Sequence, residues 1–276
     1  MILAMICFPT MDVMAKYLTQ TQPVLQVVWA RYTGQFLLIL CVFSPKLNQV
    51  VKTRYPVLQL ARSAALFGGT CFFFTSLYFL DQGQTSAIFM VSPVLITVLA
   101  VIFLAEKIGP RRILSVLGGF VGALIIIQPQ SDIFTPASLL PLVAAGFFAS
   151  YSILTRKLGD AESSQTTLFF TAGFGALISS LILPFIWVNP ANLPEMIMMA
   201  SMSLFGGLGH YALILSLNRV EASETAPLNY LSVFFAMLWG WLIFVEVPSA
   251  ATLSGAALII LSGIYLWRRE NLQPGN

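Results

Sequence analysis

Long apolar stretches separated by short polar breaks are the feature that most constrains this chain. A helix needs roughly 20 apolar residues to cross a hydrocarbon core ~30 Å thick, and such stretches follow one another almost without pause through the 276 residues. Hydrophobic residues make up 58% of the chain and charged residues only 9%, with a mean hydropathy of +0.85. Soluble domains are far less apolar than this. We therefore expect an all-α integral membrane protein with no room for a separate soluble domain.

Polar and turn-rich breaks divide the chain into ten predicted spans. The first span is short and begins at the amino terminus without a signal-peptide cleavage pattern, so we leave open that a few preceding residues are absent from this sequence. The ten spans are Ile2–Leu18, Val24–Phe43, Leu60–Leu80, Thr85–Leu104, Arg112–Ile127, Ala137–Leu154, Thr166–Val188, Met196–Leu217, Thr225–Phe244 and Ala251–Trp267.

The basic residues test this count, because Lys and Arg gather in cytoplasmic connections. The opposite set of connections holds only Lys16, and Arg31 lies inside a span. This distribution predicts a multi-pass protein of the inner (plasma) membrane with both termini in the cytoplasm. The other twelve basic residues share one set of connections and ends: Lys46, Lys52, Arg54, Arg62, Lys107, Arg111, Arg112, Arg156, Lys157, Arg219, Arg268 and Arg269.

The sequence lacks the motifs of common enzyme classes. It contains no phosphate-binding P-loop, no HExxH and no GxSxG motif, and only one histidine could act as a base or ligand. Cys7, Cys41 and Cys71 lie in apolar stretches without the CxxC spacing of metal or redox sites. The net charge of +3 follows from the topology of the basic residues. We therefore expect no enzyme activity, no cofactor, no metal and no nucleic-acid partner.

The two halves of the chain align with each other at one offset, which places Phe8 on Phe148 and which we call the repeat offset, with a slip of about one residue in the last span. This alignment predicts two five-helix repeats, residues 1–132 and 133–276. Because five is an odd number of crossings, the second repeat is inverted in the membrane relative to the first, as in many alternating-access transporters. The repeat offset also matches Lys16 with Arg156, Thr85 with Thr225, Ser92 with Ser232, and Glu106 with Glu246.

Four sequence features resemble the EamA type of the drug/metabolite transporter superfamily. They are the Asp-Val-Met-Ala-Lys-Tyr-Leu stretch of Asp12–Leu18, the Arg31-Tyr32 pair, the glutamates Glu106 and Glu246 that close spans four and nine, and Glu-Thr-Ala-Pro-Leu-Asn-Tyr of Glu224–Tyr230. The first and last stretches are similar to bacterial S-adenosylmethionine and riboflavin uptake carriers. The resemblance implies ten helices in two inverted repeats, no ATP hydrolysis, and a central cavity lined by spans one, three, four, six, eight and nine.

Ionisable side chains within the spans are candidates for function, because a charge in hydrocarbon is unfavourable unless it is paired or wetted. Asp12 and Lys16 lie four residues apart on one helical face and can pair. At ~1.5 Å per residue, Asp12 lies about 9 Å and Arg31 about 13 Å below the outer surface. Our hypothesis is that Asp12 and Arg31 form a gate pair or bind ionic groups of a substrate. The alternative is a structural ion pair that joins spans one and two.

The remaining candidates are polar or aromatic residues of later spans. His210 lies in a glycine-rich tract that allows close helix approach, and it is either a proton relay or a hydrogen-bonded packing residue. Asn229 and Tyr230 are predicted substrate contacts, with Glu224 nearer the cytoplasmic mouth. The alternative is that these three polar groups only bridge helices.

Two prolines and two further tyrosines complete the set. Pro93 and Pro227 each predict a bend in their helix, because proline frees a backbone carbonyl. Tyr78 and Tyr151 are predicted cavity walls, since a tyrosine offers both a stacking face and a hydroxyl group.

The sequence therefore predicts a secondary active transporter of a small polar or amphipathic metabolite. An amino-acid or drug exporter of the same fold is one alternative, and a channel or non-transporting membrane scaffold is another. Its expected partners are the lipid bilayer and a small-molecule substrate. Coupling to protons and formation of a homodimer are left open.

Overall fold

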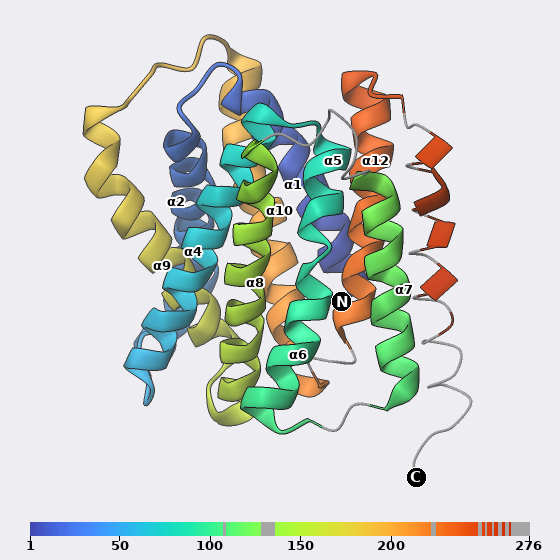
Figure 1. Ribbon diagram of the computed structural model, residues 1–276. Coiled ribbons are helices and arrows are strands. Elements are labelled where there is room, and N and C mark those ends of the chain that lie inside the picture. The colour runs from blue at the N-terminus through green and yellow to red at the C-terminus, as the bar shows by residue number, and fades with distance from the viewer. Residues whose placement is uncertain are drawn as a thin grey trace.

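The computed structural model is a bundle of helices (Figure 1). It describes residues 1–106, 109–127, 136–221, 225–247, 250–251, 253–255, 257–258, 261–262 and 265. The α-helices are α1 (Ile2–Thr19), α2 (Val24–Phe43), α3 (Leu47–Val50), α4 (Pro56–Phe79), α5 (Gln82–Phe89), α6 (Ser92–Leu104), α7 (Pro110–Ile127), α8 (Leu139–Leu158), α9 (Ser164–Ile182), α10 (Leu193–Arg219) and α12 (Leu231–Phe244). The 3-10 turns are η1 (Ser44–Lys46), η2 (Pro136–Ser138), η3 (Gly159–Ala161), η4 (Leu183–Phe185) and η5 (Ala226–Tyr230).

Seven helical stretches in the described part are long and apolar enough to cross a membrane. They confirm the predicted all-α, multi-pass membrane fold. A shorter apolar helix at Leu228–Phe244 matches the ninth predicted span, and α7 matches the fifth. The tenth predicted span, Ala251–Trp267, lies partly outside the described residues, so the count of ten stays a prediction. The seven stretches are Ile2–Thr19, Val24–Val50, Pro56–Phe79, Gln82–Leu104, Pro136–Leu158, Ser164–Phe185 and Leu193–Arg219.

The start of α4 differs from the prediction. The helix begins at Pro56 and not at Leu60, because proline is well suited to the first turn, where its missing N–H is not needed. Arg62 lies in the second turn of this helix and is completely buried. The pattern of basic residues predicts Arg62 among the cytoplasmic connections and ends, but its side chain points into the bundle, where it bonds to Thr155 and Thr171.

The fourth predicted span is interrupted near its middle. Helix α5 ends at Phe89 and α6 begins at Ser92, with Pro93 in the first turn of α6. Proline cannot donate to the carbonyl four residues before it and its ring clashes there, which accounts for a break at this place. The ninth span has a similar interruption, since the 3-10 turn η5, which contains Pro227, leads directly into α12.

The two halves of the chain pack against each other in a regular pattern. Helix α1 lies along α10 and α12, while α8 lies along α4 and α6. Helix α2 packs on α10, and α9 packs on α4. Glycines allow two of these crossings to be close. A Cβ atom on Gly209 would lie 2.7 Å from Phe8 Cε1, and one on Gly69 would lie 3.2 Å from Phe147 Cβ.

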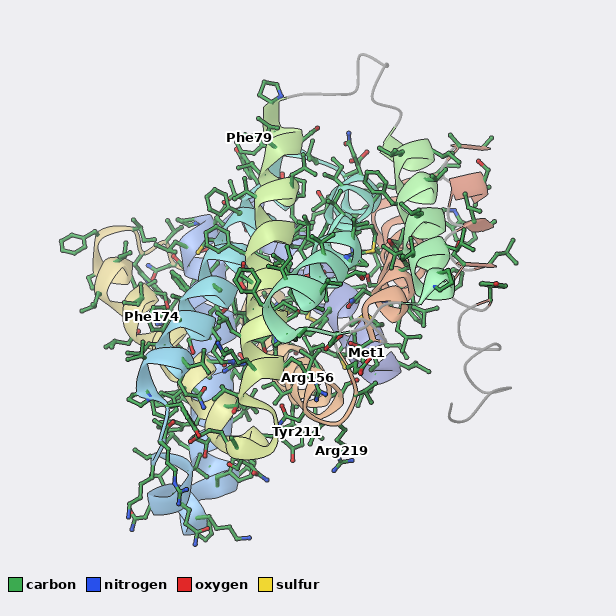
Figure 2. All side chains as sticks on the ribbon, turned by 60° about the horizontal axis from the view of Figure 1, so that its bottom comes forward. Met1, Phe79, Arg156, Phe174, Tyr211 and Arg219 are labelled. Carbon is green, nitrogen blue, oxygen red and sulfur yellow. The ribbon has the colours of Figure 1, made fainter. Side chains whose placement is uncertain are left out.

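The ends of the bundle carry different side chains. Figure 2 shows Arg156 and Arg219 toward the same end and Phe79 at the opposite end. Large apolar side chains such as Leu37, Val101 and Leu181 are exposed around the outside of the bundle. Such a surface would be unusual in water and suits contact with lipid.

Candidate functional site

A small cavity of about 90 Å³ lies between α1, α2, α4, α5, α8, α10 and the region of η5 and α12. Its wall combines aromatic rings with polar side chains. The aromatic residues are Phe8, Phe73, Phe74, Phe89 and Phe148, and the polar ones are Asp12, Arg31, Thr70, Ser86, His210, Asn229 and Ser232. Four predicted site residues, Asp12, Arg31, His210 and Asn229, are thus brought together.

Arg31 is buried and joins three helices. Its Nη1 donates a hydrogen bond to Thr70 Oγ1 on α4, and its Nη2 to His210 Nε2 on α10. The Tyr32 hydroxyl shares a hydrogen bond of 2.9 Å with Thr70 Oγ1, and the guanidinium carbon lies 4.6 Å from the centre of the Tyr32 ring. The guanidinium is therefore held in one place by α4, α10 and its own helix.

Two buried hydrogen-bond donors on Arg31 and His210 have no partner among the described residues. A guanidinium only donates, so His210 Nε2 must accept and the imidazole proton must reside on Nδ1. Within the described residues, neither His210 Nδ1 nor Arg31 Nε has a hydrogen-bond partner, although both atoms are buried. Unpartnered buried polar atoms are unfavourable. These two donors beside a cavity are therefore available to a ligand or to water.

Asp12 lines the same cavity but forms neither of the predicted ion pairs. The described residues place no hydrogen bond or salt bridge on its carboxylate. Arg31 uses two of its nitrogens for Thr70 and His210. Lys16 lies one helical turn farther along α1 and instead binds Glu246, with Asp81 Oδ1 3.6 Å from its ammonium nitrogen. The carboxylate of Asp12 thus remains beside the cavity.

The predicted tyrosines occupy three different environments. Tyr151 is completely buried, with its ring edge-on to His210 at 6.0 Å between centroids. Tyr230 donates a hydrogen bond of 3.1 Å to the Val116 carbonyl of α7. Tyr78 lies away from the cavity, because its side chain is 48% exposed and packs edge-on against Phe79. Glu224, the remaining candidate, lies outside the described residues.

Arg62 is a buried cation that the sequence reasoning missed. Its Nε donates to Thr155 Oγ1 at 3.0 Å, and its Nη1 donates to Thr167 O at 2.9 Å and to Thr171 Oγ1 at 2.7 Å. Its guanidinium carbon lies 4.8 Å from the centre of the Tyr151 ring. The signal that could have found it is the polar face of Gln59, Arg62 and Ser63, whose spacing of three or four positions places these side chains together on a helix.

The arrangement suits the binding of a ligand that has both a polar and an apolar part. The guanidinium of Arg31 and the carboxylate of Asp12 line the cavity together with aromatic rings, which can hold a charged or polar group together with an apolar one. No group of three metal-ligating side chains converges within the part of the chain that the structure describes.

Comparison with known proteins identifies the family. The model of the EamA-like transporter family matches residues 1–128 and again residues 135–268. An S-adenosylmethionine uptake transporter of Rickettsia felis is 26% identical over 265 residues, covering 96% of this chain and 90% of the relative. A riboflavin transporter of Brucella anthropi is 30% identical over 229 residues, covering 81% of each chain.

A solved structure supports the same fold. It superimposes with a TM-score of 0.75 at 17% identity and covers 99% of both chains. Both relatives are named as transporters and not as enzymes, in agreement with the resemblance of Asp12–Leu18 and Glu224–Tyr230. The chain is a multi-pass membrane protein that belongs to the EamA-like transporter family.

Proposed function

We propose that this protein is a secondary active transporter that moves a small polar or amphipathic metabolite across the inner membrane by alternating access. The central observation is the position of Arg31. Its two hydrogen-bond partners, Thr70 and His210, are separated by the repeat offset and so occupy equivalent positions in the two halves. Arg31 thus lies where the halves meet, which is where carriers built from inverted repeats bind their substrates.

Two inverted five-helix repeats, residues 1–132 and 133–276, are part of this proposal. The repeat offset relates the first residues of α2 and α9, and it also relates the last residues of α4 and α10. The packing of α1 on α10 corresponds to that of α8 on α4, and the packing of α1 on α12 corresponds to that of α8 on α6. The family model also matches the chain twice. Both termini of such a protein lie in the cytoplasm, which a carboxy-terminal reporter fusion would test.

The cavity favours a substrate with both a charged and an apolar part. Arg31 and Asp12 can bind groups of opposite charge, the His210 Nδ1–H can donate, and Phe8 and Phe148 offer aromatic surface. Sites for metabolite-sized ligands usually enclose roughly 300–1,000 Å³, compared with about 90 Å³ here. We therefore expect the substrate to bind a form of the protein in which these helices have moved apart.

Substrate counterflow in proteoliposomes tests the proposal. Vesicles preloaded with S-adenosylmethionine, riboflavin, amino acids or nucleosides should accumulate the labelled form of the true substrate. A channel would carry flux without stimulation by exchange, and a scaffold would carry none. If vesicles with the protein accumulate no more of any compound than vesicles without it, the protein does not transport this set of metabolites.

Variants of the cavity test its location. Asp12→Asn and Arg31→Lys should each reduce counterflow at least about tenfold. Asp12→Asn loses the negative charge, and Arg31→Lys loses the planar guanidinium that can form two parallel hydrogen bonds with the substrate. Lys52→Gln, an exposed residue outside the cavity, is the matched control and should transport as the parent does. If Asp12→Asn loses folded protein but the surviving fraction transports normally, Asp12 is structural and the site lies elsewhere.

A further inference from the structure

Two ion pairs lie at opposite ends of the helix bundle, and each joins the first half of the chain to the second. At one end, the Lys16 ammonium donates a hydrogen bond to Glu246. At the other end, Arg156 Nε lies 3.9 Å from Glu106 Oε1. We call Lys16 and Glu246 the outer pair and Arg156 and Glu106 the inner pair. Helix α12, which ends just before Glu246, reaches the top of the view in Figure 1, and α6, which ends just before Glu106, reaches the bottom.

The two pairs are equivalent under the repeat. The repeat offset places Lys16 on Arg156 and Glu106 on Glu246. Each basic residue comes from the first helix of its half, and each glutamate follows the fourth span of the other half. Chance surface contacts would not match both partners of both pairs under a single offset. The two pairs are therefore equivalent contacts in the two repeats, and each one lies toward a different face of the membrane.

The helix ends that carry the glutamates have the same unusual backbone. Helix α6 is followed by Ala105 with φ 54°, and α12 is followed by Val245 with φ 58°. Among the described residues these are the only non-glycine residues with positive φ, a conformation that side chains disfavour. The N–H group of the next residue, the glutamate, bonds back to Ala100 O at 3.3 Å or Gly240 O at 3.1 Å. Equivalent caps thus hold both glutamates in place.

The cavity lies between the two pairs. On α1, Asp12 lines the cavity and Lys16 lies one turn farther toward the outside. On α8, Phe148 lines the cavity and Arg156 lies about 12 Å farther along the helix at ~1.5 Å per residue. Each pair therefore joins helices of the two halves on one side of the cavity. A contact that exists only when its own side is closed can shift the balance between the two open forms.

We propose that the outer and inner pairs are the two latches of the transport cycle. Release of the outer pair opens the cavity to the outside, and release of the inner pair opens it to the cytoplasm. Both pairs are formed in this structure, in keeping with its small cavity. The inference rests on the proposed alternating-access function and adds the residues that control it.

Labelling of one cavity cysteine from each side of the membrane tests the latches. The reporter is Ser86→Cys, which lines the cavity on α5, in a chain whose three native cysteines are replaced by alanine. A membrane-impermeant maleimide is applied to right-side-out and to inverted vesicles. Glu246→Gln should raise labelling from the outside about fivefold or more and lower it from the cytoplasmic side, as for typical two-state coupling. Glu106→Gln should do the reverse.

Two controls separate latching from general loosening. Asp81→Asn removes a carboxylate that also lies near Lys16 but is 73% exposed at its side chain, and it should leave both labelling rates unchanged. Lys16→Glu should open the outer side, and adding Glu246→Lys should close it again. This reversed pair also serves as the test if Glu246→Gln does not accumulate.

The outcomes distinguish the two proposals. If the reporter in the parent is labelled from both sides but neither glutamine variant changes the ratio, the latches are wrong and alternating access stands. The latches are also wrong if both variants increase labelling from the same side. If the parent is labelled from one side only in the presence of every candidate substrate, alternating access itself fails.

Discussion

At the scale of single residues, neighbouring positions have different roles. Asn229 lines the cavity, whereas the adjacent Tyr230 is 1% exposed and its hydroxyl bonds to the Val116 carbonyl of α7. The ring of Tyr230 also lies against Gly119, where a Cβ atom would collide with Tyr230 Cε2. In the sequence, Asn229 and Tyr230 are parts of one polar stretch and cannot be told apart by position. Only the contact with α7, which comes much earlier in the chain, separates a cavity residue from a packing residue.

This difference predicts opposite effects for two substitutions. Tyr230→Phe should lower the stability of the folded protein by about 1 kcal/mol, the value of a typical hydrogen bond, and leave transport unchanged. Asn229→Ala should reduce transport, because Asn229 lines the cavity. Thermal unfolding in detergent and counterflow measure the two quantities. A Tyr230→Phe variant that is stable but inactive would place the hydroxyl among the substrate contacts.

At the scale of helices, the closeness of α1 and α10 depends on glycine. A Cβ atom at Gly209 would meet Phe8 Cε1 at 2.7 Å and Cys7 Cβ at 3.2 Å, while one at Gly146 in α8 would meet nothing within 4 Å. Gly209→Ala should therefore destabilise the protein by roughly 1–3 kcal/mol through overpacking. Gly146→Ala, the matched control, should stabilise it by roughly 0.5–1 kcal/mol, because alanine favours the helix. Equal thermal midpoints for the two variants would contradict this account.

The left-handed cap after α12 gives a second prediction at this scale. Val245 has φ 58° and a side chain that is largely exposed, so glycine would relieve backbone strain and lose little packing. Val245→Gly should raise stability by about 1 kcal/mol. Val247→Gly, at an equally exposed position without positive φ, should give no gain. A loss of stability in Val245→Gly as large as that in Val247→Gly would show that the cap is not strained.

At the scale of the molecule, hydropathy predicts much of the fold, because a helix that crosses a bilayer leaves a strong local signal in the sequence. The glycine tract before His210 likewise predicts close helix approach from local residue size. The partners of Lys16 and Arg62 could not be predicted, because they lie on helices distant in sequence. The start of α4 was missed because its first turn contains Pro56 and Gln59, and a hydropathy average assigns such residues to the preceding loop.

The burial of Arg62 has a consequence for biosynthesis. Outside α4, the hydrogen-bond partners described for it, Thr155, Thr167 and Thr171, belong to the second half of the chain. While the ribosome is still translating that half, the guanidinium has none of these acceptors, and an uncompensated charge in hydrocarbon is unfavourable. We therefore expect membrane proteases to degrade the first half of the chain, residues 1–132, until the second half has been synthesised and inserted.

Pulse-chase labelling of separately expressed halves measures this dependence. Residues 1–132 alone should be degraded within a fraction of the lifetime of the whole chain, and co-expression of residues 133–276 should extend their half-life. An Arg62→Met version of the first half should survive longer on its own. Equal lifetimes for the two first-half versions would remove Arg62 as the cause. If the Arg62→Met version lives longer, a single arginine makes the survival of the first half depend on the synthesis of the second half.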